Sequence, residues 1–237
     1  MTEQEFKEAL RKKGIELTDE QMRQFDAYYH LLVDWNTRMN LTAITDKEDV
    51  YGKHFYDSIT ACDYIDVSNV RSVVDVGAGA GFPSIPIKIV FPHLEVTIID
   101  SLNKRITFLH TLSDALSLSG VQAIHSRAEE AGRKSEYRDR FDVAISRAVA
   151  RMPVLTELCM PFVKPGGTFL AMKGSQGMEE LAESKKAIQA LGGKLKQSFT
   201  FALPGDDGDR VMLLIDKISN TPKKYPRKPG TPNKDPL

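Results

Sequence analysis

Three glycines alternate with alanines in the segment Gly77-Ala78-Gly79-Ala80-Gly81, directly after the apolar, β-branched run Ser72–Val76. Such a run predicts a strand that is buried on both faces. Glycine permits positive φ and lets a ligand approach the main chain. Pro83 and Pro86 follow, and proline is tolerated in the first turn of a helix. The segment predicts a strand, a tight turn and a helix, the ligand crevice of a doubly wound sheet. The alternative is a tight turn that binds nothing.

A carboxylate follows the glycine turn at a spacing that suggests a nucleoside ligand. Asp100 ends the apolar run 95–99, about twenty residues after Gly77. A carboxylate at this position can accept hydrogen bonds from both hydroxyls of an adenosine ribose. The ligand is therefore expected to carry a ribose, as dinucleotides and S-adenosylmethionine both do.

The glycine spacing favours S-adenosylmethionine over a dinucleotide. Dinucleotide sites use G-x-G-x-x-G, which aims a helix N-terminus at a pyrophosphate. This chain has G-x-G-x-G instead, and S-adenosylmethionine has no phosphate to bind. The turn Pro165-Gly166-Gly167 and a closing β-hairpin favour the methyltransferase arrangement as well.

The elements around these residues predict an α/β protein. From residue 71 onward strand-like and helix-like segments alternate, which is typical of a parallel sheet with helices between the strands. The last two strands, 194–203 and 210–215, have no helix between them and are expected to pair antiparallel. We expect three parts: a helical extension at residues 1–65, a methyltransferase domain at 66–220 and a basic, proline-rich tail at 221–237.

Charge is balanced overall, with 32 basic and 32 acidic residues, but the tail is basic. A basic tail suggests an anionic partner, and the alternative is a solvated, disordered end. Its repeated prolines predict no regular structure. Cys62 and Cys159 form neither a disulfide framework nor a metal-ligand spacing, so we expect no metal. Since no signal peptide or membrane-length apolar run is present, we expect a cytoplasmic protein without membrane contact.

The chain resembles the glucose-inhibited division protein B family in motifs that span its whole length. The motifs are Trp35-Asn36, Asn40-Leu41-Thr42, His54-Phe55-Tyr56-Asp57-Ser58, Asp75 to Pro83, Ser146-Arg147-Ala148 and Tyr225 to Pro232. This resemblance implies a bacterial S-adenosylmethionine-dependent methyltransferase that methylates N7 of a guanine in 16S, small-subunit ribosomal RNA. The implied fold is the class I, Rossmann-like methyltransferase fold, with a mostly parallel seven-stranded sheet.

The resemblance also implies roles for individual positions. The implied cofactor contacts are Gly77, Gly79 and Phe82 at the first turn, Asp100, Ser101 and Leu102 at the ribose, Ala128 and Glu129 at the adenine, and Arg147 beside the cofactor and the incoming base.

The residues after the strand 141–145 bear on the methyl acceptor. Enzymes that methylate exocyclic amines of bases usually have an Asn-Pro-Pro-aromatic segment here, and this chain has Ser146-Arg147-Ala148 instead. Methylation at cytosine C5 needs a cysteine nucleophile, and neither cysteine is expected at a strand end. Guanine N7 has a free lone pair, so its methylation needs alignment rather than a base. Arg147 is the candidate catalytic residue that positions the guanine; the alternative is a salt bridge with Glu129 or Asp100.

The RNA is expected to present a loop or a flipped-out base. Arg151, Lys173, Arg210 and the tail cations are candidate phosphate contacts, and His54 and Asp57 are candidates for the mouth of the site. We expect a monomer that acts on small-subunit ribosomal RNA or its assembling particle. Two alternatives stay open: a methyltransferase for a protein or small molecule, and a catalytically silent ribosome-binding factor.

Overall fold

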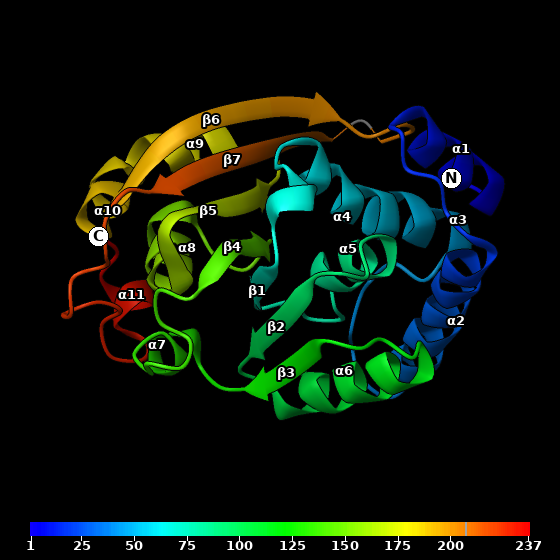
Figure 1. The fold of residues 1–237 in the computed structure, drawn as a ribbon, viewed down its shortest axis with the longest axis horizontal. Helices are drawn as coiled ribbons and strands as arrows, with labels where there is room; N and C mark the ends of the chain where they lie inside the picture. Colours follow the sequence, from blue (N-terminus) through cyan, green and yellow to red (C-terminus); the bar gives the residue numbers. More distant parts are fainter. Residues whose placement is uncertain (207) are drawn as a thin grey trace.

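The protein, described by a computed structural model over residues 1–206 and 208–237, is built on a seven-stranded sheet (Figure 1). The strands are β1 Ser72–Val76, β2 Glu95–Asp100, β3 Val121–His125, β4 Phe141–Arg147, β5 Val163–Lys173, β6 Gly193–Ala202 and β7 Asp209–Lys217. Their order is β3-β2-β1-β4-β5-β7-β6. Strands β1 to β5 run parallel, and β7 pairs antiparallel with both β5 and β6. The predicted sheet and its closing hairpin are confirmed. The expected loop between β6 and β7 includes Asp207, which lies outside the described residues.

Helices cover both faces of the sheet. They are α1 Glu3–Lys12, α2 Asp19–Asn36, α3 Lys47–Asp49, α4 Asp57–Thr60, α5 Ser84–Val90, α6 Asn103–Ala115, α7 Ala128–Ala131, α8 Met152–Cys159, α9 Gly177–Glu183, α10 Lys185–Ala190 and α11 Thr231–Lys234, with a π-helical turn at Val50–Tyr56 and 3-10 turns at Ala61–Asp63, Val67–Asn69 and Met160–Phe162. Ser184 separates α9 from α10. None of the described helices is long and apolar enough to cross a membrane.

Alternate strand residues enter two separate cores, as a pleated sheet requires. Val73 of β1 packs in a core with α1, α2, α5 and α6, whereas its neighbour Val74 packs in a core with α8 and α10. The strands are apolar on both faces because each face is covered. Their parallel register places the carboxyl ends of β1, β2, β3 and β4 along one edge, where ligands bind in open α/β sheets.

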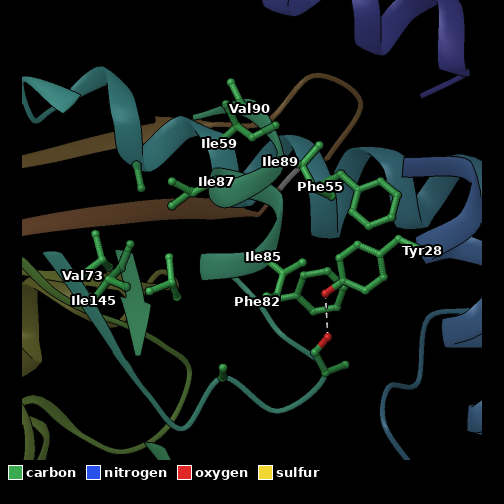
Figure 2. Close-up of a cluster of buried hydrophobic side chains, with 14 of the residues drawn as sticks. Tyr28, Phe55, Ile59, Val73, Phe82, Ile85, Ile87, Ile89, Val90 and Ile145 are labelled. Carbon is green, nitrogen blue, oxygen red and sulfur yellow. Dashed lines mark hydrogen bonds between the residues drawn. The ribbon is translucent and has the colours of Figure 1, made fainter. Parts of the chain in front are cut away.

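The N-terminal helices support the glycine turn directly. A capping box starts α2: the Thr18 side chain accepts a hydrogen bond from the Gln21 amide. From α2, the Tyr28 ring stacks on Phe82 with centroids 5.4 Å apart. Its hydroxyl donates to the carbonyl oxygen of Ala80 at 2.6 Å (Figure 2). The extension therefore holds the main chain of the turn in place.

The tail is folded, contrary to the prediction of no regular structure and to the alternative of a disordered end. Tyr225 is buried, and the segment ends in the short helix α11, beside α7 and α8 in Figure 1. The Arg138 guanidinium donates to the carbonyl oxygens of Thr221 and Tyr225 at 2.7 and 2.8 Å. The prolines are compatible with this path because Pro232 lies in the first turn of α11, where a missing N–H costs nothing.

Candidate cofactor and catalytic site

A cavity of about 480 Å³ lies at the carboxyl ends of the four parallel strands β1 to β4, within the size range of small-molecule sites. Of the predicted site residues, those that line it are Gly77, Gly79, Phe82, Asp100, Ser101, Ala128, Glu129 and Arg147. Leu102 is the exception. Its side chain is 52% exposed and it is not one of the lining residues; only its amide takes part, donating to Asp100 Oδ1 at 2.9 Å.

The three glycines of the turn all have positive φ, at +78°, +61° and +98° for Gly77, Gly79 and Gly81. Gly81 and Gly79 serve different purposes. A Cβ on Gly81 would lie 2.7 Å from the Tyr28 hydroxyl, so Gly81 permits close packing of α2. A Cβ on Gly79 would meet nothing within 4 Å. Gly79 lines the cavity, so its bare main chain is open to a ligand.

Asp100 is buried and already fixed by the protein. Its Oδ2 accepts from the Gly79 amide and from Arg105 Nη1, both at 3.3 Å, and its Oδ1 accepts from Leu102. A carboxylate offers about four acceptor positions, and three of them are used within the protein, so about one remains for a ribose hydroxyl. Arg105 also lines the cavity. Sequence reasoning missed it, although a cation in the first turn after the ribose acid was the available signal.

Arg147 ends β4 and is held on three sides. Its Nη1 forms an ion pair with Asp57 Oδ2 at 2.8 Å. Its guanidinium lies over the Phe82 ring, 5.0 Å from the centroid, and its Nη2 lies 3.3 Å from His54 Nδ1. The alternative of a salt bridge with Glu129 or Asp100 is therefore wrong: the partner comes from the N-terminal helical segment.

His54 is a neutral member of the site. Because a guanidinium can only donate, Nδ1 accepts from Arg147, and Nε2 carries the proton toward the Thr42 hydroxyl at 2.8 Å. The ring stacks on Phe82 with centroids 4.5 Å apart. Burial, together with the Arg147 charge, lowers the pKa of His54 to about 3. Of the two residues predicted at the mouth of the site, His54 lines the cavity and Asp57 acts behind it, on Arg147.

The candidate phosphate contacts differ in availability. Lys173 is buried, forms an ion pair with Glu180 at 2.7 Å and donates to the Ala150 carbonyl. It is therefore a structural cation, which corrects that prediction. Arg210 is shared between Asp206 and Asp57, at 2.7 and 3.4 Å. Arg151 remains exposed despite its pair with Glu183.

The tail contributes to the cavity, a feature that the sequence did not indicate. Glu129 of α7 is buried, and its Oε1 accepts from the Gly230 amide at 2.9 Å. Three residues further on, Asn233 is one of the lining residues. The last turn of the chain thus forms part of the same wall as the segment after β3.

These features fit S-adenosylmethionine. The buried carboxylate of Asp100 suits a ribose, and the open main chain at Gly79 suits an amino-acid moiety. The described residues include no cluster of three or more His, Cys, Asp or Glu that could hold a metal.

Comparison with known proteins places this site in a family. The family model described as GidB, rRNA small subunit methyltransferase G, matches residues 21–206. Over 237 residues, and 100% of both chains, the sequence is 60% identical to Ribosomal RNA small subunit methyltransferase G of Lysinibacillus sphaericus (strain C3-41). It is 56% identical to the protein of the same name from Bacillus subtilis (strain 168), over 100% of this chain and 99% of the relative.

Solved structures show the same fold at low identity. M. jannaschii TYW2 in complex with AdoMet is 19% identical with a TM-score of 0.53, over 70% of this chain and 76% of that one. A variant of the 16S rRNA (adenine(1408)-N(1))-methyltransferase from Catenulisporales acidiphilia is 15% identical with a TM-score of 0.55, over 73% of this chain and 93% of that one. Both support the class I methyltransferase fold for the chain.

Proposed function

The chain belongs to the GidB family, rRNA small subunit methyltransferase G, and on this premise we propose that it methylates N7 of a guanine in 16S, small-subunit ribosomal RNA. S-adenosylmethionine is the methyl donor. The observation that carries the proposal is the cavity that joins the ribose acid Asp100 to a fixed arginine, Arg147. We further propose that the enzyme is a cytoplasmic monomer acting on the RNA or its assembling particle, with residues 66–220 as its methyltransferase domain.

The cofactor is held along the edge of the sheet. Asp100, with Ser101, would accept the ribose hydroxyls, and the Gly77–Gly79 main chain would contact the amino-acid moiety. Ala128 and Glu129 would frame the adenine. When bound, S-adenosylmethionine supplies a methyl group on a positively charged sulfur.

The acceptor side needs alignment rather than proton transfer. Guanine N7 has an in-plane lone pair and no proton to lose, so correct placement supplies most of the rate acceleration. Arg147 would donate to the guanine edge while leaving N7 free. Asp57 and His54 fix the guanidinium in one orientation. Asp57 also balances the arginine charge, and His54 is neutral, so the site adds little positive charge beside a cationic methyl donor.

A second cavity of about 330 Å³ continues on the other side of Arg147. It shares His54 and Arg147 with the first and is also lined by Lys53 and Arg210. These cations would contact the RNA backbone as the guanine enters as a loop base or a flipped-out base.

The cofactor part of the proposal is tested by calorimetric titration of S-adenosylmethionine into wild type and Asp100→Asn. We expect the variant to bind about ten- to a hundredfold more weakly, because the ribose hydroxyl loses its hydrogen bond to a charged acceptor. Asp114→Asn, an exposed carboxylate on α6, should bind as wild type does. Normal affinity in Asp100→Asn would contradict the ribose assignment.

The acceptor part is tested by incubating the protein and radiolabelled S-adenosylmethionine with small-subunit RNA or particles, followed by nucleoside mass spectrometry. We expect 7-methylguanosine. A different methylated nucleoside, or label in protein only, would exclude the proposed acceptor. If the chain does not bind the cofactor at all, the alternative of a catalytically silent ribosome-binding factor would be favoured.

A further inference from the structure

The tail segment Thr221–Lys234 is anchored to the body at three successive points. The first is Arg138, which donates to the Thr221 and Tyr225 carbonyls. The second is the fully buried Glu157 of α8, which accepts from the Arg227 amide and Nη2, both at 2.7 Å, and from its Nε. The third is Glu129, which accepts from Gly230. A buried carboxylate is costly without hydrogen-bond partners. Because the tail supplies partners to Glu157 and Glu129, these two carboxylates fix its position.

The last anchor determines where α11 lies. Gly230 has a φ of +81°, which turns the chain sharply before Thr231. Pro232, in the first turn of α11, is buried, whereas Asn233 is exposed and lines the cavity together with Ser126–Glu129. Asn233 is thus part of the cavity wall, on a tail segment that Glu157 and Glu129 anchor.

This part of the cavity is the adenine end. If Asp100 holds the ribose and the glycine turn holds the amino-acid moiety, the base must extend away from the turn, because the two groups leave the ribose from opposite sides. The strand next to β2 on that side is β3, and the residues that follow β3 are Ser126–Glu129. Asn233 lines the same cavity as these residues, and three residues before it the Gly230 amide donates to Glu129 Oε1 at 2.9 Å.

We propose that Asn233 recognises the adenine of the methyl donor through its amide, which makes the tail a part of the cofactor site. Asn is the side chain that pairs with the outer edge of adenine, accepting from the N6 amino group and donating to N7. In the inosine counterpart an oxygen replaces the N6 amino group, so that edge presents two acceptors, as guanine does, and cannot form the same pair. The inference rests on the proposed function, since it takes the ligand to be an adenosyl compound.

The test compares two ligands on two proteins. S-adenosylhomocysteine and its inosine counterpart, in which oxygen replaces the N6 amino group, are titrated calorimetrically into wild type and Asn233→Ala. We expect Asn233→Ala to bind S-adenosylhomocysteine about tenfold more weakly, in line with a paired hydrogen bond. The preference of wild type for the adenosyl over the inosyl ligand should shrink by a similar factor.

Two controls separate recognition from folding. Lys234→Ala removes the neighbouring exposed cation and should leave both affinities and the preference unchanged. The melting temperature of Asn233→Ala should equal that of wild type, since the side chain is exposed.

The outcomes are distinguishable. An unchanged adenosyl-over-inosyl preference in Asn233→Ala would overturn the role of Asn233 while leaving the proposed function intact. A wild-type chain that binds neither ligand would overturn the proposed function itself.

Discussion

Two arginine–carboxylate pairs connect the outer parts of the chain to the sheet, and they differ in what remains free. Arg147 pairs with Asp57 of the N-terminal helical segment through one short bond, and its guanidinium also borders two cavities. Arg227 of the tail pairs with Glu157 through its amide, Nε and Nη2, and Asp235 accepts from the rest of its fork. The guanidinium of Arg147 therefore keeps donors for a ligand, whereas the donors of Arg227 are taken up by the protein.

This difference fits the proposed role of Arg147 in positioning a guanine and an anchoring role for Arg227. A saturated, buried pair carries specificity for one arrangement of the chain, and removing one partner leaves an uncompensated charge. An arginine that keeps unused N–H donors and lies over an aromatic ring can still bind a ligand. Charge alone does not distinguish a substrate-binding arginine from a structural one; the count of unused donors does.

The largest expected effect is on methyl transfer by Arg147→Ala. Removing a fixed donor at the acceptor should lower the turnover number by about a hundredfold or more, by analogy with the loss of one preorganised donor. Arg147→Lys should be nearly as slow, because a lysine cannot reproduce the planar fork. The measurement is single-turnover methylation of small-subunit RNA with saturating cofactor. Arg23→Gln, which removes an exposed ion pair on α2, should keep wild-type turnover; retained turnover in Arg147→Ala would make that arginine structural as well.

The next effect is on the stability of Arg227→Leu. Glu157 is fully buried, and its loss of partners should lower the free energy of unfolding by about 3 kcal/mol. The double variant Arg227→Leu with Glu157→Leu should recover most of that loss, because no buried charge remains. Urea unfolding followed by circular dichroism measures both. A single variant as stable as wild type would show that the tail is not anchored by this pair.

The effect of a single pH unit is smaller, and it comes from the imidazole of His54, which lies against the cavity-facing pair. The folded pKa of His54 is lowered to about 3 by burial, so between pH 6.5 and 3 the unfolded chain binds more protons at this residue. Stability therefore falls as pH falls through that window, by at most about 1.4 kcal/mol per pH unit. His54→Gln should flatten the decline, as measured by unfolding at pH 6.5, 5.5 and 4.5. An unchanged slope would contradict the neutral assignment of His54.

Asp75 supplies the opposite slope in the same range. It is buried in β1 and accepts from the Ser84 amide at 3.1 Å, and burial raises its pKa to about 7. Between pH 4 and 7 the folded chain binds more protons here, so stability falls as pH rises. In Asp75→Asn this loss should disappear, so the free energy of unfolding at pH 7 should rise relative to that at pH 4. A profile that tilts the other way would contradict a protonated carboxyl in the folded protein.

The sequence was sufficient where the signal is local. The glycine turn, the strand before it and Asp100 are predicted from spacing within one βαβ unit, and the structure has them together. Arg147 was also placed correctly, at a strand end. Its partner was not, because Asp57 lies 90 residues away in the chain and no periodicity relates the two. Asn233 was missed for the same reason. The prolines around it predicted no regular structure, because the sequence does not show that the buried Glu157 binds the tail.

The hydrogen bond from Tyr28 to the Ala80 carbonyl makes the sheet domain depend on the N-terminal helices. Burial raises the pKa of the Tyr28 phenol, so the hydroxyl keeps its proton and donates throughout the range in which the protein is folded. Removing α2 would leave the Ala80 carbonyl without that donor and uncover the Phe82 ring on which the tyrosine stacks. A fragment that begins at residue 66 would therefore be a Rossmann-like scaffold without a fixed cofactor loop, and a minimal enzyme must begin before Asp19.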